Sequence, residues 1–262
     1  MSHPGDQISA YAAEFRLPTV ASELVLQLEH AGLESALPVV LDVFEHEHLD
    51  RRHRRVQRLR RASKLPIGKT FDVFDEKRLP AALQRQLRDL KRGDFLDDAR
   101  NVLCFGLPGT GKTHAACALG HCLVEQGRTV LFAPTYELVQ RLLVAKRDLE
   151  LTRVLRKLDH FDLLILDDIG YVRQSPAEVE VLFTLMAERY ERKSMLITSN
   201  LVFSDWDQIF QNPMTTASAI DRVVHHSVIL EFAVASYRTK GRIAAETAIK
   251  EKTKRKKKSG GS

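Results

Sequence analysis

Gly106-Leu107-Pro108-Gly109-Thr110-Gly111-Lys112-Thr113 is the stretch of this 262-residue chain that decides its fold. It matches the pattern G-x-x-x-x-G-K-[ST], whose glycines let backbone N–H groups turn inward around phosphates. An apolar run at 101–105 precedes the motif and a helical pattern follows it, as expected for a P-loop. We therefore expect ATP with Mg²⁺ to be bound here, by Gly106, Pro108, Gly109, Thr110, Gly111, Lys112, Thr113 and His114.

Two of these side chains have specific tasks in such a loop. Lys112 would reach the β- and γ-phosphate oxygens of ATP, and the Thr113 hydroxyl would ligate Mg²⁺. Downstream, short apolar runs alternate with helical patterns, which predicts a parallel sheet covered by helices on both faces. The fold class is thus α/β. Strands are predicted at 101–105, 128–133, 162–166, 194–199 and 227–232, and helices at 113–126, 135–148, 150–159, 176–192, 204–210 and 215–225.

A pair of acids ends the third predicted strand, in Leu163-Leu164-Ile165-Leu166-Asp167-Asp168. An unpaired carboxylate at the end of a buried strand is costly, and a bound Mg²⁺ would remove that cost at Asp167. Asp168 could orient or deprotonate the attacking water. The alternative is that the two acids only cap a helix.

Three further polar residues are candidates for the chemistry of the γ-phosphate. Asn200 follows the fourth strand and could position water, although Ser and Asn also commonly begin turns. Arg222 could be a surface ion pair. In oligomeric P-loop ATPases, however, an arginine of the neighbouring subunit often stabilises the transferring phosphoryl group. Arg238 is a second candidate phosphate-sensing arginine.

The net charge of +6 is unevenly distributed along the chain. Residues 17–50 contain seven acids and no Lys or Arg, whereas 51–61 contain seven arginines and 250–258 seven basic residues. Clustered cations favour an anionic polymer such as DNA, although a charge run can also be a solvated face. The candidate DNA contacts are Arg51, Arg52, Arg54, Arg55, Arg141, Lys146, Arg147, Arg153, Arg156 and Lys157.

The same patterns suggest the domain organisation. Residues 1–62 form a small all-helical domain, with two helices within 18–49 and an Arg-rich stretch that continues the second or forms a third. Residues 63–100 are a linker leading into the ATPase domain at 101–249, and 250–262 are a basic flexible tail. The apolar stripe of the acidic helices favours a protein partner, or packing against a sister subunit or the ATPase core.

Composition excludes several other classes of protein. No apolar run approaches the ~20 residues of a membrane span, and the N-terminus does not resemble a signal peptide. The three cysteines, Cys104, Cys117 and Cys122, lie in or near apolar sequence, as reduced buried thiols of a cytoplasmic protein do. None of the ten histidines pairs with cysteine at zinc spacing, so no metal site made by protein side chains alone is expected.

Together these residues resemble the AAA+ ATPases, and more narrowly their initiator and helicase-loader branch. Over about residues 18–245, short motifs in the right order and spacing resemble the IstB family, the ATPase helper proteins of a class of bacterial insertion sequences. The motifs are Lys64-Leu65-Pro66, Lys69-Thr70-Phe71-Asp72-Val73-Phe74, Gly109-Thr110-Gly111-Lys112-Thr113-His114, Glu188-Arg189-Tyr190-Glu191-Arg192, Ile197-Thr198-Ser199-Asn200, Trp206, Asp221-Arg222-Val223 and Ser236-Tyr237-Arg238.

The resemblance implies an ATP-dependent homo-oligomer, a ring or spiral, that binds and deforms duplex target DNA on the bacterial nucleoid and stimulates a partner transposase. It implies that Lys112 and Thr113 bind nucleotide and Mg²⁺, and that Asp167 binds Mg²⁺. Asp168 would support hydrolysis, Asn200 would be the first sensor and Arg222 the trans-acting arginine. The basic helices at 141–157 match the place where initiator-branch ATPases carry an extra helix on the inside of their spiral.

Two features depart from the family pattern. Many AAA+ proteins have Glu where Asp168 stands, and a carboxylate one methylene shorter changes the geometry of the attacking water. We also expect no full helical lid after the last strand, which weighs against Arg238 as a lid-borne sensor. Two other functions keep the ATPase: a DnaC-type replicative helicase loader, which would prefer single strands, and a DNA-coating protein whose assembly ATP licenses. A small-molecule kinase shares the P-loop but leaves Asp167-Asp168 and Arg222 unexplained.

Overall fold

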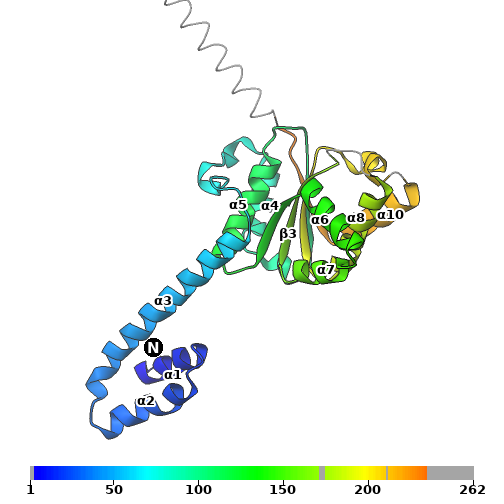
Figure 1. Ribbon diagram of the computed structural model, residues 1–262. Helices are drawn as coiled ribbons and strands as arrows, with labels where there is room; N and C mark the ends of the chain where they lie inside the picture. Colours follow the sequence, from blue (N-terminus) through cyan, green and yellow to red (C-terminus); the bar gives the residue numbers. More distant parts are fainter. Residues whose placement is uncertain (1–2, 171–174, 211, 235–262) are drawn as a thin grey trace, which may run out of the picture. The chain divides into compact units, whose positions relative to one another are not determined.

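The computed structural model describes residues 3–170, 175–210 and 212–234. The chain divides into two compact units, Met1–Arg58 and Leu59–Ser262 (Figure 1). Helix α3 (Leu37–Ala62) contributes residues to both units. In the described residues, no helix is both long and apolar enough to span a bilayer.

The first unit is helical throughout. It comprises α1 (Pro4–Glu14), α2 (Pro18–His30), the 3-10 turn η1 (Glu34–Ala36) and most of α3. The two helices predicted within 18–49 are present, and the second continues through the Arg-rich stretch. Helix α1 was not predicted; its start has a proline in the first turn and the His3 side chain as its N-cap. Buried Ile8 and Ala12, with the Phe15 ring stacked at 5.8 Å on Phe44, form its core.

The second unit is built on five parallel strands in the order β2-β3-β4-β1-β5. The strands are β1 (Asn101–Phe105), β2 (Val130–Pro134), β3 (Leu163–Ile169), β4 (Ser194–Ser199) and β5 (Ser227–Glu231). The helices are α4 (Ala81–Leu90), α5 (Lys112–Glu125), α6 (Thr135–Arg147), α7 (Leu151–Asp159), α8 (Pro176–Arg189), α9 (Asp207–Phe210) and α10 (Pro213–Val224). Short 3-10 turns lie at η2 (Phe71–Val73), η3 (Glu76–Arg78), η4 (Asp94–Leu96) and η5 (Phe203–Asp205).

Helices cover both faces of this sheet, as the continuous apolar strands predicted. Alternate strand residues such as Leu164 and Leu166 share one core with α6, α8 and α10. Ile165, between them, faces the other way: a methyl group added to Gly120 of α5 would lie 2.9 Å from its Cδ1. Figure 1 shows α4 and α5 on one side of the sheet and α6, α8 and α10 on the other.

Two of the three cysteines are buried in this unit. Burial raises the pKa of the Cys104 thiol to about 12, and that of Cys117 to about 12. Both therefore stay protonated at neutral pH and act as small apolar side chains. Cys122 is only half-buried, which departs from the expectation for that residue.

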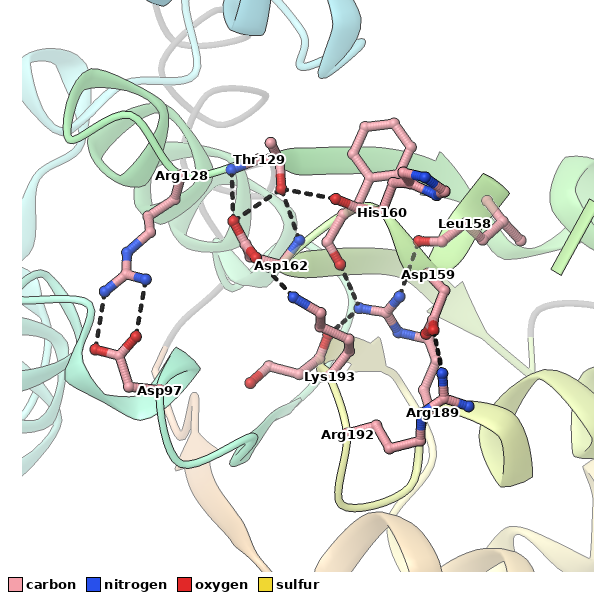
Figure 2. Close-up of polar contacts among 12 residues, drawn as sticks. Asp97, Arg128, Thr129, Leu158, Asp159, His160, Asp162, Arg189, Arg192 and Lys193 are labelled. Carbon is pink, nitrogen blue, oxygen red and sulfur yellow. Dashed lines mark hydrogen bonds and ion pairs between the residues drawn. The ribbon is translucent and has the colours of Figure 1, made fainter. Parts of the chain in front are cut away.

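An arginine holds together the edge of the sheet where the strands begin. Arg189, at the end of α8, is 1% exposed. Its guanidinium donates hydrogen bonds to the carbonyl oxygens of Leu158, Phe161 and Ser194, each at 2.9 Å (Figure 2). Burial lowers the pKa of Arg189 to about 10, so the side chain remains charged at neutral pH. It thereby joins the end of α7 to the chain that leads into β3 and to the first residue of β4.

Because all strands are parallel, their carboxyl ends meet at one edge of the sheet. The P-loop follows β1, the two acids lie just before the last residue of β3, and Asn200 follows β4. Strand order places β4 between β1 and β3, so its polar end lies between the loop and the acids. Ligands of open α/β sheets bind at this edge.

Candidate functional site

The loop after β1 has the backbone that its glycines allow. Gly106, Gly109 and Gly111 have φ values of 149°, 82° and 102°. A Cβ on Gly106 would lie 2.7 Å from the carbonyl oxygen of Phe232, so this position excludes a side chain on two grounds. Gly111 is the N-cap of α5, so the free N–H groups and the positive end of that helix's dipole meet the loop. Such a helix start binds phosphate.

The Lys112 side chain is held in place by hydrogen bonds to the P-loop. The side chain is 6% exposed, and its ammonium donates to the carbonyl oxygens of Gly106 at 2.7 Å and Leu107 at 2.9 Å. A further hydrogen bond, of 2.8 Å, runs to Oδ1 of Asn200. A buried ammonium needs such acceptors, and phosphate oxygens could replace them.

A bulge in β3 positions the two acids. Leu166 pairs with Ile197 and Ile169 with Ser199, so Asp167 and Asp168 occupy a stretch with one more residue than its partner strand. Asp168 has φ 60°, in the left-handed region. The two successive carboxylates are therefore not forced onto opposite faces of a regular strand.

A short network of hydrogen bonds runs through this bulge. The Thr198 hydroxyl accepts from the backbone N–H of Asp168 at 2.8 Å and donates to Oδ1 of Asp167 at 2.7 Å. The Asn200 amide donates to Oδ1 of Asp168 at 2.7 Å. Lys112, Asn200 and Asp168 thus form one connected chain of polar side chains, although they are widely separated in sequence.

These groups open onto a pocket of about 520 Å³. Its walls include the predicted site residues Pro108, Gly109, Gly111, Lys112, Thr113, His114, Asp168 and Asn200. Of the two acids it is Asp168 that lines the pocket, while the Asp167 carboxylate is engaged by Thr198. Thr110 is buried beneath the loop, where its hydroxyl bonds to Leu107. The volume, the loop amides, the lysine and the oxygen donors fit a nucleoside triphosphate with Mg²⁺.

One wall of the pocket was not predicted from residue patterns. It is formed by residues of the segment that the sequence suggests is a linker: Lys69, Val73, Phe74, Asp75 and Arg78. His114 joins this segment to α5, with Nε2 3.0 Å from the carbonyl oxygen of Thr70 and its ring centroid 4.9 Å from that of Phe74. Two 3-10 turns carry no periodicity that would predict the contact. The one sequence signal is the run 69–74 in the family resemblance.

The two candidate arginines differ in what the structure describes. Arg222 lies on α10 with its guanidinium 4.3 Å above the Phe183 ring of α8. Its Nη1 is buried, and among the described residues it has no hydrogen-bond partner. Among those residues Arg222 does not line the 520 Å³ pocket of its own chain. Arg238 lies outside the described residues.

The candidate DNA contacts on α3 are partly engaged within the first unit. Arg51 pairs with Glu47 at 2.5 Å and lies 4.3 Å over the ring of Phe15, which gives it a packing role. Arg54 also reaches Glu47, at 3.2 Å. Arg52 and Arg55 are exposed.

The candidates in the second unit lie on α6 and α7. Four of them form ion pairs: Arg141 with Glu137, Lys146 with Glu180, Arg147 with Asp148 and Arg153 with Glu150. Exposed pairs of this kind contribute only about 0–1 kcal/mol, so phosphates can compete for these cations. Arg156 and Lys157 project from the exposed face of α7, whose apolar face is anchored by buried Leu158.

Comparison with known proteins agrees with the geometry of the loop. The family model described as IstB-like ATP binding protein matches residues 10–245. The chain belongs to this family. A protein of Sinorhizobium fredii named as an insertion sequence ATP-binding protein is 42% identical over 236 residues, which cover 89% of this chain and 79% of that protein. One of Geobacillus stearothermophilus, named for the insertion sequence IS5376, is 32% identical over 89% of this chain and 94% of its own.

Solved structures share the fold of most of this chain. The DnaC helicase loader is 18% identical and matches with a TM-score of 0.53 over 63% of this chain and 97% of its own. The replication initiator DnaA bound to AMPPCP and single-stranded DNA is 16% identical, with a TM-score of 0.54 over 64% and 51%. At these identities the likeness concerns the fold alone. The predicted AAA+ fold and the IstB family are both confirmed.

Proposed function

We propose that this IstB-like protein is a Mg²⁺-dependent ATPase that assembles on duplex DNA and stimulates the transposase of its insertion sequence. The observation that carries the proposal is the continuous contact from Lys112 through Asn200 to Asp168 at the mouth of a P-loop pocket. The relatives' names, which join ATP binding to insertion sequences, support the biological setting.

Each residue of the site has a task in this reaction. Loop amides and Lys112 bind the phosphates of ATP, because Lys112 exchanges its carbonyl partners for phosphate oxygens. Thr113 and Asp167 would hold Mg²⁺, which would neutralise charge on the phosphoryl oxygens. Asp168 accepts a proton from the attacking water, and Asn200 fixes the orientation of its carboxylate. The Thr198 hydroxyl links the Asp167 carboxylate to the backbone N–H of Asp168 and so helps to position both residues.

Arg222 completes the site of a neighbouring subunit. Its buried Nη1, which has no hydrogen-bond partner in the described part of the chain, and its position against α8 support a role outside its own pocket. Removing such an arginine lowers turnover by about 10³–10⁵-fold. We expect Arg222→Ala to abolish turnover while ATP binding is retained.

A mixing experiment separates action in trans from action in cis. Arg222→Ala subunits keep an intact pocket, and Lys112→Ala subunits keep Arg222. If Arg222 acts in trans, mixing the two inactive variants restores part of the ATPase activity, because some interfaces then combine both intact parts. Mixtures that stay inactive although they assemble would place Arg222 in its own site or in a structural role.

The first test of the whole proposal is ATP hydrolysis without DNA, with duplex and with single-stranded DNA, while light scattering follows oligomer size. We expect duplex DNA to stimulate hydrolysis and to yield large assemblies. Selective stimulation by single strands would favour a helicase loader of the DnaC type. Bound ATP without hydrolysis under any condition would favour an assembly role for ATP. Adding the transposase of the insertion sequence then tests whether the protein stimulates it. The proposal requires that the strand-transfer activity of the transposase rise when this protein and ATP are both present.

A further inference from the structure

Three metal-ligating side chains meet at the edge of the sheet opposite the nucleotide pocket. Glu191 lies in the loop between α8 and β4, and His225 and His226 lie in the turn between α10 and β5. Their ligand atoms all lie within 4.8 Å of one another. His226 Nε2 is 3.8 Å from Glu191 Oε1, and the two imidazole centroids are 4.3 Å apart.

A buried asparagine fixes the backbone on which these groups stand. Asn101, at the start of β1, is 5% exposed and lies between the two segments. Its side chain donates to the carbonyl oxygen of Val223 at 3.1 Å and accepts from the N–H of Met195 at 2.9 Å. Its own N–H bonds to the carbonyl oxygen of His226 at 2.8 Å. The two chain segments are therefore held in place by the core, and the three ligands extend from them into solvent.

We propose that Glu191, His225 and His226 form a binding site for a divalent transition metal, Zn²⁺ in particular. Two imidazoles and one carboxylate are a ligand set that zinc takes with water in the fourth position. Mg²⁺ and Ca²⁺ prefer oxygen ligands, so this site is chemically distinct from the one beside the P-loop. A tetrahedral site with ligands at about 2.0–2.1 Å needs donor atoms about 3.4 Å apart. Rotation of exposed side chains supplies that small change.

The Tyr190 side chain also hydrogen-bonds to Glu191, but that contact involves neither histidine and does not account for the cluster. An exposed His226–Glu191 ion pair contributes little to stability and leaves the convergence of His225 unexplained. Glu191 has φ 55°, an uncommon backbone conformation for a residue with a side chain. The sequence hides the site because Glu191 is far along the chain from the two histidines and no cysteine is involved.

Metal binding here would join the loop before β4 to the end of α10. Arg222 lies on the last turn of α10, three residues before His225. A bound ion would therefore restrain the helix that carries Arg222. The metal site itself does not depend on the proposed ATPase activity, since none of its ligands belongs to the nucleotide pocket.

The test is titration calorimetry of Zn²⁺ into the full chain, freed of any affinity tag and in the absence of nucleotide. We expect one tight equivalent per chain, weakened at least about tenfold in each of Glu191→Gln, His225→Ala and His226→Ala. The matched control is His46→Ala, which removes an exposed histidine 3.5 Å from Asp42 and should leave that equivalent unchanged. Three variants that bind Zn²⁺ as the wild type does, or equal loss in His46→Ala, would overturn the proposal.

A second measurement does not require any variant to fold. Zn²⁺ should raise the unfolding temperature of the wild-type chain at concentrations at which Mg²⁺ alone does not, because only the folded state brings the three ligands together. Circular dichroism and ATP affinity of each variant show whether its fold and pocket are intact. Absence of both the Zn²⁺ heat and the thermal shift in the wild type rules the site out.

Discussion

At the scale of single residues, the P-loop contains a position that only glycine can occupy without strain. Gly106 combines φ 149° with a carbonyl oxygen, that of Phe232, where a Cβ would need to be. The contact is with backbone, which cannot rotate away as a side chain can. Arg189 is the opposite case, a large charged side chain whose position is fixed by three carbonyl groups.

Gly106→Ala should lower the free energy of unfolding by about 2–4 kcal/mol, from backbone strain together with steric overlap. Gly32→Ala is the matched control, because Gly32 also has a positive φ, 67°, but no atom within 4 Å of the added methyl group. It should cost only about 1 kcal/mol. Urea unfolding followed by circular dichroism measures both values. Equal losses in the two variants would show that the Phe232 contact relaxes freely.

Arg189→Ala should lower the free energy of unfolding by about 3 kcal/mol or more, since it removes a buried side chain together with its three hydrogen bonds to carbonyl oxygens. The control in the same segment is Arg192→Ala. Arg192 is exposed and pairs with Asp159 and Glu188, so its removal should cost less than about 1 kcal/mol. Thermal unfolding of the two variants side by side is the measurement. A loss in Arg189→Ala no larger than in the control would mean that water replaces the guanidinium.

At the scale of elements, the bulge in β3 places two acidic residues at the nucleotide pocket edge of the sheet. One extra residue lets Asp167 and Asp168 both serve the carboxyl edge of the sheet, and Thr198 of the neighbouring strand bonds to both. In the proposed mechanism, the geometry of hydrolysis depends on the Thr198 hydroxyl, which has no chemical step of its own.

Thr198→Val keeps the shape of this side chain and removes both hydrogen bonds. We expect ATP affinity to stay within a few-fold, since the P-loop is untouched, and turnover to fall at least about tenfold because Asp168 loses its alignment. Thr184→Val on α8 is the control: its hydroxyl bonds to the carbonyl oxygen of Glu180 in the same helix and lies away from the pocket. Steady-state hydrolysis with a separate nucleotide-binding assay distinguishes the two effects. Unchanged turnover in Thr198→Val would remove Thr198 from the mechanism.

At the scale of the whole molecule, the clustered basic residues and the nucleotide pocket are on different parts of the chain. The nucleotide pocket lies at the carboxyl edge of the sheet, whereas the candidate DNA-binding cations lie on α3 in one unit and on α6 and α7 in the other. If DNA stimulates hydrolysis as proposed, the coupling has to pass through assembly or through the helices that connect these regions.

Arg156→Ala combined with Lys157→Ala should weaken duplex binding and reduce the slope of log affinity against log salt by about 2, one for each lost phosphate contact. The control is Arg85→Ala with Arg88→Ala, which removes two exposed arginines from α4, across the sheet from α7. Fluorescence anisotropy at several salt concentrations gives both slopes. A larger change in the α4 variant would move the DNA interface to the other side of the sheet.

Local sequence patterns were enough to predict much of the fold and of the candidate site. The P-loop, the five strands, most helices, the Asp167-Asp168 pair and the IstB resemblance are all readable from residue type and spacing, because burial in a parallel sheet imposes continuous apolar runs. Four features escaped that reading: helix α1, helix α4 within the predicted linker, the pocket wall formed by residues 69–78, and the half-exposed position of Cys122. Helix α4 does carry a helical period in Leu83, Leu87 and Leu90, and the pocket wall is signalled only by the run 69–74 of the family resemblance. Helix α1 and the exposure of Cys122 leave no motif specific enough to identify them.

Tertiary structure alone decided which distant residues meet. Three sets of contacts join segments that are far apart in the sequence. Lys112 bonds to Asn200, and Arg189 bonds to Leu158 and Ser194. Glu191 lies beside the two histidines. The register of β3 against β4, including its bulge, sets where the carboxylates point, and a one-residue difference in register is invisible in composition. Sequence specifies each strand and loop; the hydrogen bonds and packing between strands specify the site.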